Sequence, residues 1–487
     1  MGIGISGETD ETDVVAQHDV IVVGAGMAGL LAALRIGELR SGTRVLVVDA
    51  GRPMAERERY GSGDWGGFGG AGLFLGGRVY IGPATIPVLP PTTLPAGAAP
   101  ILDGAAYEAR AREVNALLDA LGATAPLRER PDERILAAIA QAEAAGLEYV
   151  TSYPARFLSI DERLGVLRGL RGRLANAGVT FRFGARVTAI RRDDQRATGY
   201  RVRVAASEGS AAEAEASFTA RALLLAPGRY GAEWLVAMAR DLDVRLNALP
   251  PAFGVRLELP QAAYAPLTAI NPDPRLQRAL PSDALAQTYA TIPGGRVTAV
   301  ERYGRLVASA VPLAAAEKMP TTTLSVLVRP GVEGASADAG GAWAGAETYG
   351  ATLNARYPGR LVVQRMADVR AGRTTTADGL AAGPVTPTHA EAVPGRLDDV
   401  YPAVYWQAYD DLLGRIARLA PGVLTEDALA YGPAEEHFWH FPTDAQLQTN
   451  QPGVFVAGDA AGLSQGIVQA AVTGLLAGEG VAAYLAG

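Results

Sequence analysis

The chain has 487 residues, of which 49% are hydrophobic and 20% charged, and its formal net charge is −7. This composition excludes a mostly disordered chain, and the acidic balance without a basic cluster argues against nucleic acid as a partner. The absence of cysteine excludes cysteine nucleophiles, thiolate-ligated zinc, iron–sulfur clusters and cysteinyl-linked cofactors.

The first stretch, residues 1–16, is predicted to be a loose acidic tail. The apolar run 20–36 that follows is short and apolar enough to be mistaken for a signal or membrane-spanning segment. Its acidic flank and its three glycines in turn-forming positions oppose both interpretations. We therefore expect no membrane span here and a cytoplasmic protein.

The next elements are predicted to run strand, turn, helix, strand. Residues 20–23 are a β-branched run suited to a strand buried on both faces, residues 27–38 form a helix, and residues 44–48 form a second buried strand. This is the βαβ order of a dinucleotide-binding fold. The N-terminus of its helix offers free N–H groups and a positive dipole end to phosphates.

Three glycines lie in the turn before this helix. Gly24 permits the tight turn, Gly26 lets the backbone approach a pyrophosphate, and Gly29 lets the helix pack close to the strand. Asp49 ends the second strand 23 residues after Gly26 and can accept hydrogen bonds from an unphosphorylated ribose. The predicted dinucleotide site also includes the neighbouring residues Met27, Ala28 and Ala50.

A second G-x-G-x-x-G pattern, at residues 67–72, is not interpreted as a second fold of this kind. No buried strand precedes it and no helical pattern opens at it. The pattern is instead typical of a loop that carries aromatic and apolar side chains, here Trp65, Phe68, Phe74 and Leu75. We expect Gly70, Ala71 and Gly72 to pack against a bound cofactor and Phe74 to contact the substrate.

The C-terminal region contains another strand, turn and helix. Residues 454–457 form a short buried strand that ends at Gly458-Asp459, and residues 466–485 form a helix rich in small residues. Asp459 can bind a ribityl hydroxyl or order water at a pyrophosphate, and the helix start, with Gly466, Ile467 and Val468, can face a flavin's pyrimidine edge. The alternative is that Asp459 only caps a helix and the last helix spans a membrane, which Glu479 and the glycines oppose.

Together these two ends resemble the FAD-dependent oxidoreductase superfamily, and the resemblance implies FAD as the cofactor. Residues 185–190 (ARVTAI) resemble the strand whose valine backbone meets the adenine, which assigns that contact to Val187. Residues 222–228 (ALLLAPG) resemble the strand that ends in A-T-G, which adds Ala226 and Gly228 to the site. Pro227 stands where the usual threonine would carry a hydroxyl.

A closer resemblance is to a family of poorly characterised bacterial FAD-dependent dehydrogenases. That family carries a G-F-G-G-A-G loop as at residues 67–72, a phrase similar to residues 251–261, and an ending similar to residues 457–471. The departures are Gln465 in place of a glycine and residues 437–440 in place of a Ser/Thr-rich stretch. Both lie where substrate should meet the flavin, so the resemblance implies no particular substrate.

The predicted fold class is α/β, with a discontinuous Rossmann-like FAD-binding domain and an inserted α+β substrate domain on a mostly antiparallel sheet. The FAD-binding domain is assigned to residues 17–82, 155–235 and 443–487, and the substrate or cap domain to residues 83–154 and 236–442. Strands of the second domain are predicted at residues 253–259, 297–301, 305–309 and 322–328. The Gly/Ala-rich residues 331–346 are interpreted as a mobile loop.

Proton-transfer candidates concentrate in residues 434–444 (AEEHFWHFPTD). Glu436, His437 and His440 are the catalytic candidates, and Trp439 is a candidate wall for an organic substrate. The alternative is a surface loop with two histidines and an aromatic cluster at a domain interface.

Two further cationic residues are candidates for the site. Arg256, on a predicted strand, either binds a substrate carboxylate or forms a salt bridge to Glu258 or a neighbouring acid. Lys318, the only lysine, either holds a water near the flavin N5 or is an ordinary exposed lysine. No spacing typical of metal ligands occurs, so no metal is expected.

The leading hypothesis is an FAD-dependent oxidoreductase that acts on a small, largely apolar organic molecule by hydride transfer at N5, with secondary metabolism as one setting. There is no second Rossmann unit for a nicotinamide, so O2, a carrier or transiently bound NAD(P)H is the expected electron partner. The alternatives are a flavin monooxygenase, whose D-G motif residues 226–234 lack, and a non-catalytic flavin-binding protein. An RNA-modifying flavoprotein is opposed by the acidic charge and the missing cysteines.

Overall fold

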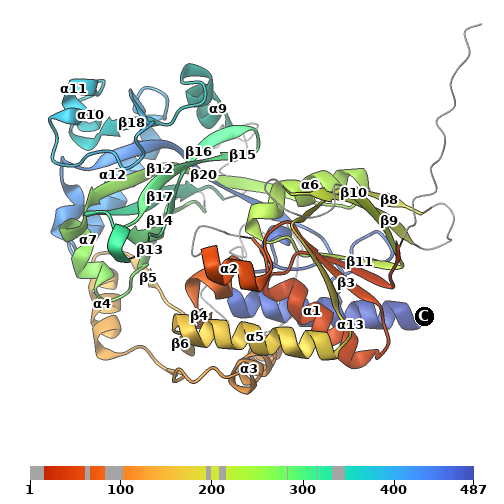
Figure 1. Ribbon diagram of the computed structural model, residues 1–487. Helices are drawn as coiled ribbons and strands as arrows, with labels where there is room; N and C mark the ends of the chain where they lie inside the picture. The colour runs from red at the N-terminus through yellow and green to blue at the C-terminus, as the bar shows by residue number, and fades with distance from the viewer. Residues whose placement is uncertain are drawn as a thin grey trace, which may run out of the picture.

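The computed structural model describes residues 16–60, 66–82, 101–102, 104–193, 199–207, 215–281, 283–313, 315–331 and 346–487. The predicted acidic tail and the Gly/Ala-rich loop lie almost wholly outside the described residues, and Trp65 lies outside them too. Figure 1 shows two parts side by side, one built on a parallel sheet at the right and one on a large antiparallel sheet at the left.

The first part is organised by a five-stranded parallel sheet in the order β21-β11-β2-β3-β7. Its strands are β2 (Val20–Val23), β3 (Val45–Asp49), β7 (Thr180–Phe183), β11 (Ala222–Leu225) and β21 (Val454–Val456). Alternate side chains of β2 serve two different cores: Val20 and Val22 pack in one cluster, and Ile21 and Val23 in another. Both faces of the sheet are therefore covered, which explains why its strands are apolar at every position.

One face of this sheet is covered by helices, and the other by a second sheet and a helix. The covering elements are α1 (Met27–Leu39), α5 (Ile160–Asn176) and α13 (Ile467–Ala486) on one face, and β8 (Ala185–Arg192), β9 (Tyr200–Ala206), β10 (Glu215–Ala220) and α6 (Ala232–Asp241) on the other. β1 (Ala16–Gln17) extends the four-stranded sheet β1-β10-β9-β8.

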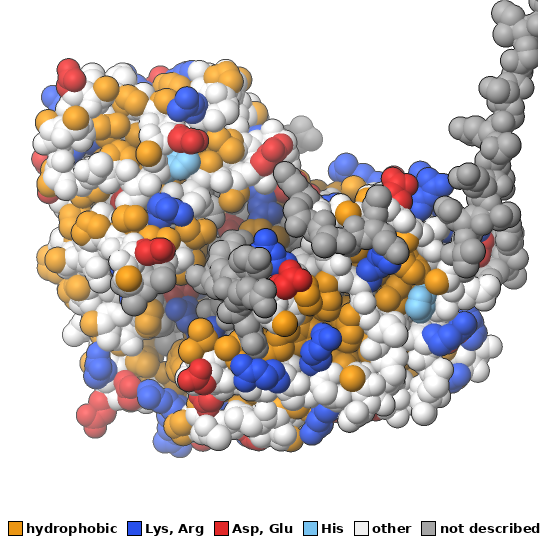
Figure 2. All heavy atoms as spheres, viewed as in Figure 1, with side chains coloured by type: hydrophobic (Ala, Val, Ile, Leu, Met, Phe, Trp, Pro, Cys, Tyr) orange, Lys and Arg blue, Asp and Glu red, His pale blue; other side chains and the backbone are white. Residues whose placement is uncertain are grey.

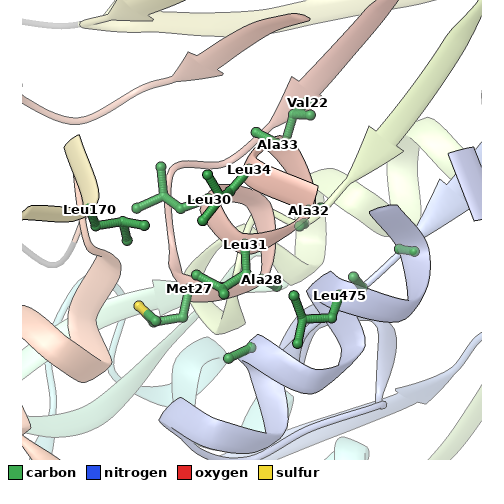
Figure 3. Close-up of a cluster of buried hydrophobic side chains, with 14 of the residues drawn as sticks. Val22, Met27, Ala28, Leu30, Leu31, Ala32, Ala33, Leu34, Leu170 and Leu475 are labelled. Carbon is green, nitrogen blue, oxygen red and sulfur yellow. The ribbon is translucent and has the colours of Figure 1, made fainter. Parts of the chain in front are cut away.

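The first and last helices pack directly on each other, although they lie at opposite ends of the chain. A side chain on Gly474 of α13 would overlap the carbonyl oxygen of Ala28, and one on Gly478 would lie 2.8 Å from that of Ala32. Figure 3 shows Leu475 of α13 beside Ala28 of α1, so the side chain next to Gly474 packs at the same helix–helix contact. Length and composition alone would allow α13 to cross a membrane, but it is mostly buried inside the protein.

The second part is an eight-stranded sheet in the order β19-β18-β20-β12-β17-β14-β13-β5, in which only the β18–β19 pair is parallel. Its strands are β5 (Glu148–Val150), β12 (Asn247–Pro260), β13 (Arg275–Ala279), β14 (Leu285–Pro293), β17 (Thr321–Arg329), β18 (Val362–Arg365), β19 (Val393–Pro394) and β20 (Leu429–His440). The buried side chains of helices α4 (Glu133–Ala144), α7 (Gln261–Thr268) and α12 (Ala403–Ile416) share its core.

The other helices, strands and turns complete the fold. They are α2 (Met54–Tyr60), α3 (Gly104–Ala120), α9 (Ala346–Arg356), α10 (Met366–Arg370), α11 (Ala377–Ala381), the hairpin β15 (Arg296–Arg302) and β16 (Arg305–Val311), the pair β4 (Arg78–Tyr80) and β6 (Ala155–Phe157), the π-helical turn η2 (Gly72–Gly76), and the 3-10 turns η4 (Arg229–Gly231), η5 (Ala315–Glu317), η6 (Pro421–Leu424) and η7 (Asp459–Ala461).

The architecture confirms the predicted fold class and the four strands predicted in the middle of the chain, now β12, β15, β16 and β17. The domain boundaries stay a prediction. The boundary at 235/236 falls inside α6, whose Leu235 and Met238 belong to the core under the parallel sheet. The described residues of the segment 83–154 belong to both parts of the molecule. Val114 of α3 packs in the core around α1, whereas Ala138 of α4 packs in the core of the eight-stranded sheet.

Candidate functional site

The turn between β2 and α1 has the shape that its three glycines predict. Gly24 has φ +106°, and a side chain there would overlap the carbonyl oxygen of Ala226. A side chain on Gly29 would overlap the carbonyl oxygen of Gly24, so this glycine is what lets α1 pack onto the turn. Gly26 has no atom nearer to a hypothetical side chain than Gly70 Cα at 4.0 Å, which leaves its outer side open to a ligand.

Asp49 joins this turn to its neighbours. Its carboxylate accepts hydrogen bonds from the backbone N–H groups of Ala25 (2.7 Å), Gly51 (2.7 Å) and Gly67 (2.9 Å). Three loops are thus held at one point, and the carboxylate also lies on the cavity described below. Its contact with a ribose stays a prediction.

The glycine loop at residues 67–72 lies against the first turn. The Gly69 N–H donates to the carbonyl of Ala25 (2.8 Å), and a side chain on Gly70 would come within 2.9 Å of Gly26 Cα. The loop leads into the five-residue π-helical turn η2 and not into a long helix such as α1.

Arg57 of α2 was missed by the sequence analysis. It has no exposed surface, donates to the carbonyls of Phe68 (2.7 Å) and Gly70 (3.1 Å), and lies 3.9 Å above the ring of Phe74. A buried cation therefore supports the glycine loop from behind. Phe74 lies against this cation and is not among the residues that line the cavity.

The C-terminal turn approaches the same place. Gly458 has φ +79° and its N–H donates to Thr473 (3.0 Å), while Asp459 accepts a hydrogen bond from Ser464. Burial raises the pKa of Asp459. Gly466, at the start of α13, is extended and exposes the first turn of the helix to the cavity.

These turns form one end of a cavity of about 1170 Å³ that extends to the eight-stranded sheet. The surface of the molecule is hollowed between its two parts in Figure 2. Predicted site residues on the cavity wall are Gly24, Gly26, Met27, Ala28, Asp49, Gly70, Ala71, Gly72, Ala226, Gly228, Arg256, Glu436, Gly458, Asp459, Gly466 and Ile467. Predicted site residues away from it are Gly29, Ala50, Phe74, Val187, His437, Trp439, His440 and Val468.

Val187 is one of these residues away from the wall. It lies in β8, is buried, and its carbonyl accepts a hydrogen bond from the indole of Trp234 (2.7 Å). The structure therefore gives its backbone a protein partner, and its contact with adenine stays a prediction.

The segment with two histidines is the second half of β20, so the surface-loop alternative is wrong. Its pairing with β12 continues to His440, which explains why these polar residues stay extended. Glu436 forms an ion pair with Arg229 (2.9 Å) at the cavity wall. His437 instead contacts Glu435 (2.8 Å), which is also paired with Arg305 (2.9 Å).

Trp439 and His440 complete this half of the strand. The indole of Trp439 donates to the hydroxyl of Tyr303 (2.8 Å), and a smaller cavity of about 90 Å³ is lined by Trp439 and His437. His440 lies 3.4 Å from Asn247, and burial lowers its pKa. Of the three catalytic candidates, Glu436 is therefore the one at the large cavity.

Arg256 is only 2% exposed and its partners are neutral. It donates to the hydroxyls of Thr323 (3.0 Å) and Ser325 (3.2 Å) and to the carbonyl of Ala290 (2.8 Å). The salt bridge to Glu258 that the sequence allowed is wrong, because the carboxylate of Glu258 is occupied by neutral donors elsewhere. Burial lowers the pKa of Arg256 to about 10, which leaves it charged at neutral pH.

Three wall residues near Arg256 were missed. Arg275 of β13 donates to Gln287 (2.8 Å) and lies 5.3 Å from the ring of Tyr289, and burial lowers its pKa. Burial also raises the pKa of Tyr289 to about 12. Asp273 is paired with Arg78 (2.8 Å). No strand was predicted over residues 275–293, and strand alternation there would have been the signal.

The lysine and the absence of a metal-ligand pattern are the remaining sequence predictions about charged groups. Lys318 is exposed and lies at the cavity wall, as either sequence interpretation allows. Among the described residues, no group of three or more histidine, aspartate and glutamate side chains could hold a metal ion.

Comparison with known proteins identifies the region around the glycine turn. A protein family described as "FAD binding domain" matches residues 19–274, which is more than half of the chain. No curated protein matches the chain in sequence.

Solved structures resemble the chain at low identity. The 3-ketosteroid-delta4-(5alpha)-dehydrogenase from Rhodococcus jostii RHA1 is 15% identical over 97% of this chain and 98% of its own, with a TM-score of 0.39. Glycine oxidase from Geobacillus kaustophilus is 14% identical over 96% and 95%, with a TM-score of 0.35. The p-nitrophenol 4-monooxygenase from Pseudomonas putida is 15% identical over 97% and 80%, with a TM-score of 0.35. Similarities this low say nothing about the substrate.

Proposed function

The chain belongs to the FAD binding domain family and is an FAD-dependent oxidoreductase, and from this premise we propose that it acts on a small organic substrate bound between the flavin and the eight-stranded sheet. The observation that carries the proposal is the continuous large cavity, which runs from the glycine turns to a wall of side chains on that sheet.

The residues at the first end of the cavity fit FAD. The open side of Gly26 and the N-terminus of α1 would hold the pyrophosphate, and Asp49 would lie at the adenosine ribose. Gly458, Asp459 and the start of α13 would hold the ribityl chain and the flavin edge. When bound, FAD supplies hydride transfer at the N5 of its ring.

The residues at the other end provide for substrate. Arg229 fixes the carboxylate of Glu436 at the wall, where it can accept a hydrogen bond or a proton from a substrate. Tyr289 stays protonated because burial raises its pKa to about 12, so it can donate to a substrate oxygen. Val187, His437 and His440 do not line this cavity, so the proposal gives them no direct part in the chemistry.

The test is anaerobic mixing of the FAD-loaded protein with NADH or NADPH, followed by addition of air. Bleaching of the flavin absorption by either nucleotide would assign the donor, and recovery in air would assign O2 as an acceptor. A bound flavin that neither nucleotide reduces is the result expected of a substrate-oxidising dehydrogenase or oxidase, which takes its electrons from the substrate itself. A flavin that cannot be reduced by any means would contradict catalysis and favour a non-catalytic binding protein.

A matched pair of variants tests the position of Glu436. Glu436→Gln keeps the size of the side chain at the cavity wall and removes its charge, whereas Glu391→Gln changes an exposed carboxylate on the surface. We expect the first substitution to alter the rate of flavin reduction by substrate and the second to leave it unchanged. Equal rates in both would remove Glu436 from the mechanism.

A further inference from the structure

The charged side chains on the cavity wall do not pair off completely. Among the described residues, six cationic side chains line the cavity, and they are Arg78, Arg128, Arg229, Arg256, Arg275 and Lys318. Three have a carboxylate partner: Arg78 with Asp273 (2.8 Å), Arg128 with Asp132 (3.3 Å) and Arg229 with Glu436 (2.9 Å). Lys318 is exposed, so water solvates its charge. Arg256 and Arg275 are the two that have neither a carboxylate partner nor full exposure to water.

The remaining carboxylates of the wall are already engaged. Asp49 accepts from three backbone N–H groups, Glu435 is paired with Arg305 (2.9 Å), and Asp459 accepts from Ser464. Within the part of the chain that the structure describes, neither Arg256 nor Arg275 has a carboxylate within salt-bridge distance. Arg256 is buried and Arg275 is half-buried, and Asp273 and Glu436 attract both charges only from beyond ion-pair distance. Because buried charges are normally paired, an anion that enters the cavity would give these two guanidinium groups the direct partner that they lack.

Arg275 has the donors to bind such an anion. A guanidinium carries five N–H groups, and Gln287 takes one of those of Arg275. Its Nε is buried, so the donors that an anion in the cavity can reach are the N–H groups of the two terminal nitrogens that Gln287 does not take. Arg256, in contrast, spends most of its N–H groups on Thr323, Ser325 and Ala290, so it contributes charge more than free donors.

We propose that Arg275 binds a carboxylate of the substrate, with the charge of Arg256 in support, so that this oxidoreductase acts on a small organic acid. A planar guanidinium with several free donors matches a carboxylate in two parallel hydrogen bonds. The hydrocarbon part of the acid would lie against Tyr289, Ile292 and Leu327, which line the same cavity. The inference deepens the proposed function and rests on it. It narrows the substrate class from the largely apolar molecules that the sequence suggested to apolar molecules that carry a carboxylate.

The experiment is calorimetric titration of the FAD-loaded protein with benzoate, benzamide and phenyl phosphate, which differ in charge at one position of the same ring. We expect benzoate to bind about tenfold or more tightly than benzamide. Arg275→Met should weaken benzoate binding by about tenfold or more and leave benzamide within about twofold. Arg256→Met should act in the same direction, whereas Arg128→Gln, which removes an exposed and paired cation from the same wall, should change neither.

Each alternative result has a definite meaning. Equal binding of benzoate and benzamide, or no binding of either at millimolar concentration, would overturn the carboxylate site. Binding of phenyl phosphate without benzoate would replace it with a phosphate site. The comparison of probes on the unaltered protein decides the matter even if a variant fails to fold. Protein that holds no FAD would contradict the proposed function itself, whereas FAD-loaded protein without a preference for benzoate would contradict this inference alone.

Discussion

Arg57 gives the sharpest test of how the glycine loop is held for the cofactor. In Arg57→Met the side chain keeps an apolar stem but loses the hydrogen bonds to Phe68 and Gly70 and the contact with the ring of Phe74. A hydrogen bond from a charged donor contributes about 1.5–3 kcal/mol. The two bonds come from one nitrogen, and the longer one is at 3.1 Å, so we count them together as about 3 kcal/mol.

This free energy stabilises the loop that carries Gly70, Ala71 and Gly72 at the cavity wall. If all of it supports FAD binding, the dissociation constant of FAD rises roughly 100-fold, and if half does, roughly tenfold. The assay is fluorescence titration of the apoprotein with FAD, together with thermal unfolding. Arg57→Lys should fall between the two proteins, because an ammonium keeps a charged donor but cannot stack a planar group on the ring of Phe74.

The matched control is Glu56→Gln, which changes an exposed neighbour on the same helix. We expect it to leave both the FAD affinity and the unfolding temperature unchanged. An Arg57→Met protein that unfolds at the normal temperature and binds FAD with normal affinity would refute the reasoning, since the loop would then be held by something else.

Three further predictions follow from single contacts. Gly29→Ala should abolish FAD binding, because the added methyl group would overlap the backbone of the turn, whereas Gly172→Ala, exposed on α5 with no atom within 4 Å, should stabilise the fold by about 0.5–1 kcal/mol in urea unfolding. Burial raises the pKa of Asp459, so the folded apoprotein holds the proton of this carboxyl group more tightly than the unfolded chain does, and the stability that the proton contributes is lost as the pH rises through the raised pKa. Asp459→Asn should therefore flatten the dependence of the free energy of unfolding on pH, measured by urea unfolding at several pH values. An unchanged slope would assign the pH dependence to another group. Glu258→Gln and Arg256→Met should couple only weakly in the free energy of unfolding, by about 0.5 kcal/mol, because Glu258 attracts Arg256 without contacting it. A coupling of about 3 kcal/mol would restore the salt bridge that the structure rejects.

The parallel-sheet part of the fold could be predicted because its information is local. Residues 20–23 are apolar at every position, and the glycines that follow have steric reasons that the coordinates bear out at Gly24 and Gly29. The strand, turn and helix at the C-terminus carry the same kind of local signal, with Gly458 in a conformation that favours glycine.

The substrate wall could not be predicted in the same way, because its residues come together through pairing of distant strands. Arg256 and Arg275 lie on β12 and β13, which are separated in the sheet by β17 and β14. Nothing in the sequence near Arg275 marks it as lacking a counter-ion, since that depends on where Asp273 and Glu436 find their own partners. Arg57 was missed for a related reason: its carbonyl partners lie in a loop without periodicity.

The most direct measurement is a crystal structure of the protein with FAD bound and benzoate soaked in. We expect the pyrophosphate at Gly26 and the N-terminus of α1, with the flavin ring between the start of α13 and the wall that Arg256 and Arg275 form. The benzoate carboxylate should lie on Arg275. A flavin that points away from the eight-stranded sheet, or a cavity wall that FAD does not reach, would contradict this expectation.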